Sequence, residues 1–286
     1  MHLAELHQKV DQTPNLPSLP AVVTKIIEAV DDPNSTVGRL NDLISKEPAL
    51  AARMLRLANS AYFGRRNGLV SLPQCALVLG FNTIRSLALS ASVHRMVQSA
   101  GVKSFNPQEF WRHSLGVGVG GRMLAKVAGQ EAEAVMAAGL VHDIGKLVLD
   151  VVARTEYAAA VTRIQEGEPS ETVEAELLGA THGEVGGWLA VKWKLPDLVV
   201  AAITYHHHPS AADATHRPVV AVVTLADSLA HALTQRRPAT EVNANLWDDA
   251  GVPYDQAAAL AEDFQREWTR AEESMGGSDR ENAQAA

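Results

Sequence analysis

The spacing of apolar residues limits the fold of this chain more than any other feature. In PAVVTKIIEAV, PALAARMLRLANSAYF and TIRSLALSASVHRMV, apolar residues recur every three or four positions, which is the period of an amphipathic helix. Sustained two-residue alternation, typical of a half-buried strand, is missing. Ser35 is a candidate N-cap for a helix near Thr36, and Pro48 suits a first helical turn. We therefore expect an all-α protein.

A polar break divides the expected helices into two lobes. The segment SAGVKSFNPQ, residues 99–108, carries Gly and Pro between two apolar regions. We expect an N-terminal helical lobe over residues 1–103 and a second helical lobe over 104–235. Residues 236–286 are expected to hold an amphipathic helix near 254–274 and a disordered tail, GGSDRENAQAA, which is too polar to form a core.

The charge and the single cysteine exclude several classes of protein. The formal net charge of −8 over 286 residues argues against a duplex nucleic-acid binder that neutralises phosphates. Cys75 stands alone, so an internal disulfide framework and a thiolate zinc cage are impossible. No segment reaches the roughly 18 uninterrupted apolar residues of a membrane span. We expect a cytoplasmic protein with no membrane partner.

The stretch AAGLVHDIGKLVLD, residues 137–150, places His142 and Asp143 in an apolar setting. Ionisable groups drawn out of water are costly unless something pairs with them. Either a metal ion or an ordinary salt bridge between Asp143 and Lys146 would serve, and this segment alone does not decide between them.

Further imidazoles and carboxylates occur in comparable apolar segments that we expect to be helical. The candidate metal ligands are His113, His142, Asp143, His182, His206, His207 and Asp227. Imidazole and carboxylate together suit Zn, Fe, Mn or Ni. A lone helical histidine is more often an ordinary core or surface residue, but so many buried ionisable groups without partners would be costly. We expect one or two metal ions here, with a hydrogen-bonded core as the alternative.

Other notable residues have simpler explanations. The run GVGVGG, residues 116–121, follows no expected strand and is better explained by close helix packing than by a phosphate loop. Trp188 and Trp193 are expected in the core. His208, His216 and His231 are assigned ordinary surface or core roles.

Taken in order, the motifs resemble the HDOD family, a branch of the HD phosphohydrolase superfamily related to HD-GYP and used as an output domain in bacterial signalling. The resemblance covers about residues 14–235. It rests on LPSLPAVVTKI, LANSAYFG, ALVLGFNTIRSLAL, FWRHS, GLVHDIGKL, HGEVGGWLAVKWKLPDLVVAAITYHHHP and LADSLAH. Each motif is weak alone, but their number and order make the match specific.

The resemblance implies two lobes, the second an HD-like helical bundle. By similarity to binuclear HD enzymes, one metal would lie among His113, His142, Asp143 and Asp227, and a second among His182, His206 and His207, with Asp143 between them. Iron is slightly favoured over zinc or manganese. Glu109, one turn before His113, is a further ligand candidate, and Lys146 would pair with a substrate phosphate.

Two functions stay open at this point. HD-GYP enzymes carry a Gly-Tyr-Pro loop after the double histidine, whereas this chain reads HHHPSAADATHRPVV. The missing loop favours a non-catalytic signalling module. Such a module would bind a protein partner and a nucleotide or phosphate ligand. The alternative is a metal-dependent phosphohydrolase acting on a nucleotide or cyclic dinucleotide, with Asp143 and Lys146 as catalytic residues. Some HD-fold relatives are di-iron oxygenases, but nothing in this sequence selects that chemistry.

Overall fold

The regular structure of the chain is helical wherever it is described. The structure, a computed structural model, describes residues 2–13, 16, 18–59 and 71–284, without the side chains of residues 56, 57, 72 and 274–284. No strand occurs in these ranges, so the all-α prediction is confirmed. Most of the LANSAYFG motif lies outside the described residues.

The helices follow one another in short steps along the chain. The first part contains α1 (Leu3–Gln12), α2 (Ala21–Asp31), α3 (Val37–Ile44), α4 (Pro48–Ala58), α5 (Leu72–Leu79) and α6 (Phe81–Ser99). The middle contains α7 (Pro107–Val127), α8 (Ala132–Val141), α9 (Ile144–Val152), α10 (Arg154–Gln165), α11 (Ser170–Leu178), α12 (His182–Lys192), α13 (Asp197–Tyr205) and α14 (Arg217–Thr234). The last part contains α15 (Ala244–Asp249) and α16 (Ala257–Gln284), and three single-turn 3₁₀ helices are η2 (Pro209–Ala211), η3 (Ala239–Glu241) and η4 (Tyr254–Gln256).

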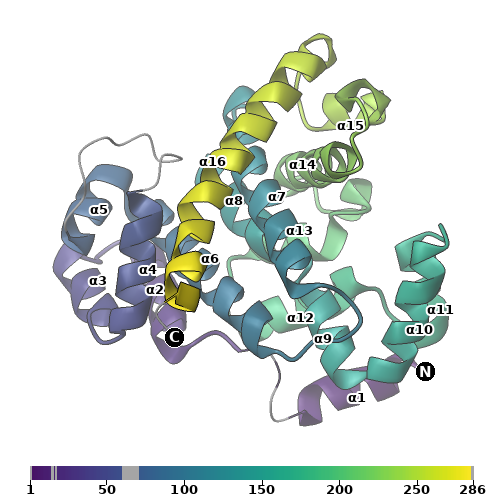
Figure 1. The fold of residues 1–286 in the computed structure, drawn as a ribbon, viewed down its shortest axis with the longest axis horizontal. Coiled ribbons are helices and arrows are strands. Elements are labelled where there is room, and N and C mark those ends of the chain that lie inside the picture. Colours follow the sequence, from purple (N-terminus) through teal and green to yellow (C-terminus); the bar gives the residue numbers. More distant parts are fainter. Residues whose placement is uncertain (1, 14–15, 17, 60–70, 285–286) are drawn as a thin grey trace.

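Two lobes are visible in Figure 1, with α2 to α5 in one group and α7 to α14 in the other. Helix α6 packs against α2 and α4 on one side and against α7 and α8 on the other, so it joins the lobes. Helix α1 differs from the expected division because it packs on α9 in the second lobe. There, Lys192 donates to Asp11 at 2.5 Å, and the His7 ring lies 4.7 Å from that of Trp188. The lobe boundaries at 103 and 235 stay a prediction.

The polar break between the lobes is held by one buried carboxylate. Asp150, fully buried on α9, accepts hydrogen bonds from the backbone amides of Lys103 at 3.1 Å and Ser104 at 2.9 Å. Arg154 also reaches the Gly101 carbonyl at 3.2 Å. The connection is therefore fixed to the second lobe by specific hydrogen bonds.

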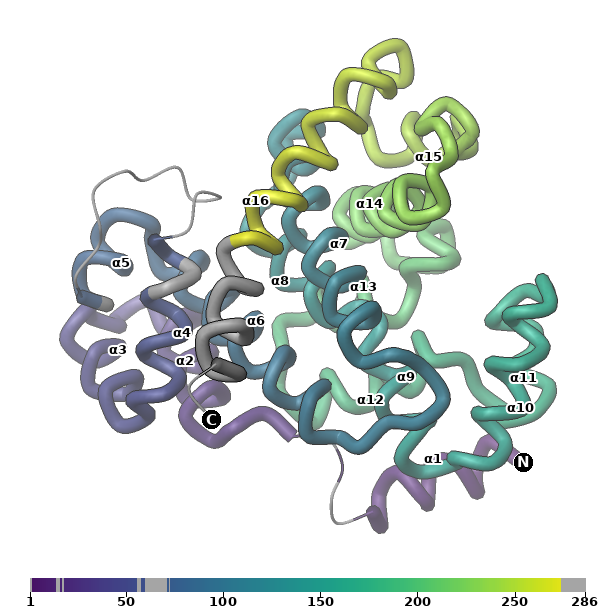
Figure 2. Tube along the Cα trace, viewed as in Figure 1, coloured from purple at the N-terminus to yellow at the C-terminus, as the bar shows by residue number. Residues whose placement is uncertain are grey.

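The glycine run on α7 provides the surface on which α16 packs. A Cβ at Gly116 would lie 2.4 Å from the Trp268 ring, and one at Gly120 would lie 1.9 Å from Phe264. Helix packing thus explains GVGVGG, as expected. Figure 2 shows α16 crossing α7 and running towards the first lobe, where it also contacts α4. The disordered tail expected at 276–286 stays a prediction, although the backbone of α16 continues as a helix to Gln284.

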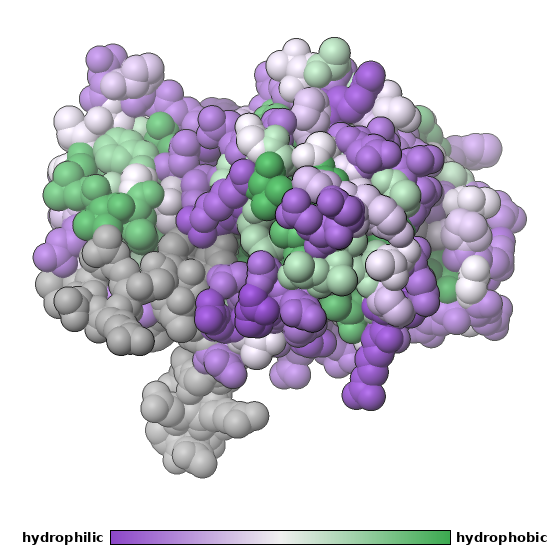
Figure 3. All heavy atoms as spheres, turned by 90° about the horizontal axis from the view of Figure 1, so that it is seen from above, coloured by the Kyte–Doolittle hydropathy of each residue, from purple (hydrophilic) through white to green (hydrophobic). Residues whose placement is uncertain are grey.

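Two smaller features complete the fold. Thr36, and not Ser35 as expected, caps α3, because its hydroxyl accepts from the Arg39 amide at 3.2 Å. None of the described helices combines the length and apolarity needed to cross a bilayer. The face in Figure 3 is largely hydrophilic, with hydrophobic residues gathered on the first lobe. In that lobe, α5 exposes Leu77 and Val78.

Candidate metal centre

Most of the candidate ligands lie at helix ends. His142 and Asp143 form the junction between α8 and α9, His182 is the first residue of α12, and His206 and His207 follow α13. This corrects the expectation that all of them lie inside helices, which is true only of His113 and Asp227. The reason is that the final carbonyls of a helix lack intrahelical partners and accept hydrogen bonds from nearby side chains.

The Nδ1 atoms of three histidines are held by hydrogen bonds. His142 donates to the Gly139 carbonyl and His206 to the Ile203 carbonyl, each at 2.8 Å. His182 donates to the Glu174 carboxylate at 2.7 Å. A donating Nδ1 leaves the Nε2 lone pair of the neutral ring free for a ligand, as in metal-bound histidines.

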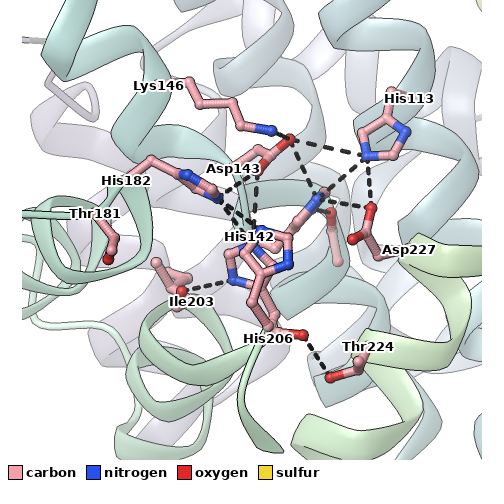
Figure 4. Close-up of polar contacts among 12 residues, drawn as sticks. His113, His142, Asp143, Lys146, Thr181, His182, Ile203, His206, Thr224 and Asp227 are labelled. Atoms are coloured by element: carbon pink, nitrogen blue, oxygen red, sulfur yellow. Dashed lines mark hydrogen bonds and ion pairs between the residues drawn. The ribbon is translucent and has the colours of Figure 1, made fainter. Parts of the chain in front are cut away.

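These Nε2 atoms converge from different helices, as Figure 4 shows for His113, His142, His182 and His206. His113 Nε2 lies 3.3 Å from His142 Nε2. His182 Nε2 lies 3.2 Å from His206 Nε2 and 3.1 Å from His207 Nε2. Two lone pairs at such distances repel each other unless a proton or a metal ion lies between them.

Asp143 lies between the two groups of imidazoles, with one carboxylate oxygen facing each. Its Oδ2 is 3.4 Å from His142 Nε2 and 3.8 Å from His113 Nε2. Its Oδ1 is 3.3 Å from His182 Nε2 and 3.7 Å from His206 Nε2. This arrangement matches a carboxylate that bridges two cations.

Asp227 completes the first group. Its Oδ1 lies 3.0 Å from His113 Nε2 and 3.7 Å from His142 Nε2. The residues therefore fall into two compact sets, His113–His142–Asp227 and His182–His206–His207, and a third set of His142, Asp143 and His206 lies between them. All seven candidate ligands come together in the second lobe.

Lys146 makes the salt bridge that was the alternative to a metal. Its Nζ donates to Asp143 Oδ2 at 2.7 Å. Burial opposes ionisation of both groups, but their attraction outweighs it, raising the pKa of Lys146 and holding that of Asp143 well below its usual range. The salt bridge and the histidine cluster therefore coexist, because Asp143 Oδ1 still faces the second set.

Protonation is unevenly distributed among the imidazoles. Burial disfavours the charged form of His142, but Asp143 and Asp227 outweigh it and raise its pKa to about 10. The pKa of His182 is also raised, since Glu174 and Asp143 overcome burial. Burial lowers the pKa of His206 to about 4 and, with His206 and His182 nearby, that of His207 to about 2. The raised pKa values of His142 and His182 thus favour the charged form of these two rings beside the carboxylates.

A cation fits the donor set. Asp143 and Asp227 are 3% and 5% exposed, and the Oδ1 of each faces an imidazole Nε2 that can donate to it only when protonated, at 3.3 Å from His182 and 3.0 Å from His113 respectively. Buried carboxylate oxygens without donors are costly, and a dication would satisfy both while taking up the Nε2 lone pairs. Nitrogen and oxygen ligands of this kind suit transition metals.

Two contributing residues were missed in the sequence. Glu174, fully buried on α11, accepts from both the Nδ1 and the backbone amide of His182, each at 2.7 Å. His231 lies 3.4 Å from Asp227 Oδ1, and its ring is 4.5 Å from that of His113. The spacing of His231 from Asp227, one helical turn, could have revealed it. No comparable signal marks Glu174.

Three residues near the cluster have different roles. Gly145 allows α9 to approach α12, because a Cβ there would lie 1.9 Å from the His182 carbonyl. Glu109, the further ligand candidate, is exposed and lines the cavity beside the site, and it contacts none of the described residues of the cluster. His208 is exposed and pairs with Glu171 at 2.8 Å, in keeping with a surface role.

A cavity of about 370 Å³ opens on one side of the cluster. His113, Asp143, Lys146 and Glu174 line its inner end. Much of the remaining wall is apolar or aromatic, with Phe105, Phe110, Tyr157, Val161, Ile164 and Trp268. A small molecule that entered this cavity would reach Asp143 and Lys146 directly.

Comparison with known proteins identifies the family. The sequence model of the HDOD domain family matches residues 16–209 of this chain. The chain belongs to the HDOD domain family. Its fold is similar to that of an HDOD domain protein of unknown function from Geobacter sulfurreducens, with a TM-score of 0.80 and 25% identity over 96% of this chain and 98% of that one.

Two further proteins are similar to this chain in sequence. A candidate phosphohydrolase from Shewanella amazonensis SB2B has a TM-score of 0.78 and 27% identity, covering 95% of this chain and 98% of its own. An uncharacterized protein of Treponema pallidum is 25% identical over 268 residues, or 91% of this chain. The HDOD chain spans about half (52%) of that relative's length.

Proposed function

We propose that this HDOD protein is a bacterial signal-transduction module that acts by binding a protein partner or a small ligand, and that its second lobe holds one or two transition-metal ions. One observation carries the metal proposal: His182 Nε2 lies 3.2 Å from His206 Nε2, 3.1 Å from His207 Nε2 and 3.3 Å from Asp143 Oδ1. The family, whose members serve as output domains in signalling, supports the regulatory role.

The proposed ligands divide into two sets. His113, His142 and Asp227 would hold the first ion, and His182, His206 and His207 the second, with Asp143 shared between them. Iron is the first choice and zinc or manganese the alternatives, since nitrogen and oxygen donors accept all three. Bound ions of this kind lower the pKa of coordinated water and polarise phosphoryl oxygens.

The cavity above the centre is the proposed ligand site of the module. Lys146 presents its ammonium at the inner end, 2.7 Å from Asp143, where it would also contact an anionic group such as a phosphate. Asp143 and His113 line the same end, and the apolar wall would contact the rest of the molecule. A nucleotide or another phosphate-bearing ligand combines these two properties.

Metal-dependent phosphohydrolysis is the second candidate, favoured by the direct opening of the cavity onto Asp143 and Lys146. In that case Asp143 would position the reacting groups and Lys146 would stabilise charge on the phosphate. The Shewanella relative described as a candidate phosphohydrolase is in line with this function. The chain nevertheless has η2 and a Ser-Ala-Ala segment where HD-GYP enzymes have Gly-Tyr-Pro, which weighs against cyclic di-GMP as a substrate.

Metal content and turnover measured on the same preparations distinguish these functions. Elemental analysis of the purified protein should find a transition metal that is reduced in His142→Ala and Asp143→Ala but retained in the exposed control His208→Ala. The regulatory proposal predicts no steady turnover of cyclic di-GMP or p-nitrophenyl phosphate by metal-loaded protein. Turnover that disappears in Asp143→Ala would establish the phosphohydrolase instead. Metal-free wild type that ignores added Fe, Mn and Zn would refute the metal centre.

A further inference from the structure

A second cavity lies where the two lobes meet, away from the metal centre. Its volume is about 260 Å³, and its wall includes the chain before α2, the second half of α6 and the end of α9. Ser18, Pro20, Ser92, Arg95 and Val151 are among the lining residues. A smaller adjoining space of about 40 Å³ shares Pro20, Ser92 and Arg95 with it and adds Arg53. The two spaces share part of their wall and together make up the junction cavity.

The N-terminus of α2 borders this junction cavity. Pro20 is the N-cap residue, and no side chain caps the helix. The amides of Val23 and Thr24 donate the first hydrogen bonds of the helix, both to the Pro20 carbonyl. The amides of Ala21 and Val22 come before these and have no acceptor within the helix. The first turn contains no acidic residue. The positive end of the helix dipole is therefore uncompensated at this point, which favours an anion.

A buried hydroxyl in the same wall independently indicates a missing polar partner. Ser92 is 3% exposed and lines both spaces, but its Oγ makes no hydrogen bond to any described residue. A buried helical hydroxyl can bond the carbonyl four residues earlier, as that of Thr83 does to Leu79 at 2.7 Å; Ser92 does not, and neither do Ser90 and Ser114, which line neither space. A ligand in the cavity would supply the partner that Ser92 lacks.

Two guanidinium groups provide positive charge beside Ser92. Arg95 is exposed and forms no ion pair with the described residues, whereas Arg85 on the same helix pairs with Asp31 at 2.7 Å. Arg53 lines the adjoining space and donates only to the Ala91 carbonyl, at 3.5 Å, within the described part of the chain. The carboxylate in the lining is that of Glu47 in the adjoining space. The balance of charge at the junction cavity is positive in a protein of net charge −8.

We propose that the junction cavity binds a phosphate group, carried by a small phosphate ester or present as inorganic phosphate or pyrophosphate. The anion would accept hydrogen bonds from the α2 amides and from Ser92, and Arg95 and Arg53 would contact it through charge-assisted bonds. A volume of about 260 Å³ leaves room for more than a phosphate ion, so the remainder of an ester fits alongside it.

The position of the site indicates a regulatory role. Ser92 and Arg95 lie on α6, the helix that joins the lobes, and Val151 lies on α9, which begins directly after Asp143. An occupant would therefore contact both lobes and stabilise one arrangement of them. This site is independent of the proposed metal centre and does not rely on its occupancy.

The test uses the full chain and pyrophosphate as the probe, with inorganic phosphate as the smaller comparison. Binding is measured by calorimetry, and ¹H–¹⁵N spectra report which amides shift. The variants are Arg95→Ala, Arg95→Lys and the control Arg236→Ala, which removes one exposed arginine from the turn after α14. Every titration is repeated after chelation and in Asp143→Ala, to separate this cavity from the metal centre.

We expect saturable binding of one pyrophosphate with shifts at Ala21 and Val22. Arg95→Ala should weaken it at least about tenfold, as expected for the loss of a charged hydrogen bond, Arg95→Lys should restore part of it, and Arg236→Ala should have no effect. Binding should survive chelation and Asp143→Ala. The proposal is overturned if neither probe binds, if Arg95→Ala and Arg236→Ala bind alike, or if Asp143→Ala abolishes binding. Circular dichroism checks that each variant is folded. If Arg95→Ala misfolds, the amide shifts of α2 in the wild-type titration serve as the test, and their absence also refutes the site.

Discussion

Substitution of Glu174 tests how the second set of histidines is held. Its carboxylate accepts two buried hydrogen bonds from His182, at Nδ1 and at the backbone amide, each 2.7 Å long. Leaving a buried donor without a partner costs about 1–3 kcal/mol. Glu174→Ala should therefore lower the free energy of unfolding of the metal-free protein by about 2–6 kcal/mol, the sum for two donors. Glu174→Gln keeps an acceptor but loses the charge, and we expect a loss of about 2 kcal/mol.

The same substitutions should weaken metal binding if the proposed centre is correct. A carboxylate that orients a metal-bound histidine typically contributes about 10–100-fold in affinity. We expect a decrease of that size in Glu174→Ala, which leaves the His182 ring free to rotate away from His206, and a smaller decrease in Glu174→Gln, which keeps an acceptor for Nδ1. Denaturant unfolding with chelator present measures the stability, and calorimetric titration with Zn²⁺ or Mn²⁺ measures the affinity.

Glu176 is a matched control on the same helix. Its side chain is 60% exposed and pairs with Arg163 at 2.9 Å, so Glu176→Ala should cost less than about 1 kcal/mol. If Glu174→Ala is no less stable than Glu176→Ala, the argument from buried hydrogen bonds is refuted. If Glu174→Ala loses the expected stability but binds metal with unchanged affinity, only the role of His182 as a ligand is refuted.

Three further predictions concern packing, the lobe connection and the metal. Gly120→Ala places a methyl group against Phe264 and should destabilise the protein by about 1–3 kcal/mol through overpacking of α7 on α16. Gly167→Ala is the comparison in the same melting experiment, because a Cβ there would meet no described atom within 4 Å and its cost comes only from the positive φ of 104°. Asp150→Ala orphans the amides of Lys103 and Ser104, and we expect a loss of about 2–6 kcal/mol with faster protease cleavage between residues 99 and 108; an unchanged cleavage rate would contradict the role of Asp150. Metal at a hundred times its dissociation constant stabilises a protein by about 2.7 kcal/mol, so chelation should lower the melting temperature of wild type and leave that of Asp143→Ala unchanged. Equal shifts in both proteins would count against Asp143 as a shared ligand.

The sequence by itself determined the helical class and the chemical types of the candidate ligands. Helical periodicity is local, so the apolar spacing in segments such as PAVVTKIIEAV is enough to predict helices. The choice of imidazole and carboxylate in apolar surroundings likewise limits the possible partners, because unpaired ionisable groups are costly there. The family resemblance then supplied the grouping of these residues, which local patterns do not contain.

Only the tertiary structure decided how these groups meet. His142 and His206 end different helices, and their Nε2 atoms converge because each Nδ1 bonds a carbonyl of its own helix while the helices pack together. Glu174 contributes through the packing of α11 beside His182, and Trp268 reaches the cavity from a helix far along the chain. α1 joins the second lobe through contacts that the sequence order does not predict. Such contacts depend on distances between remote segments, and these are set by side-chain packing over the whole molecule.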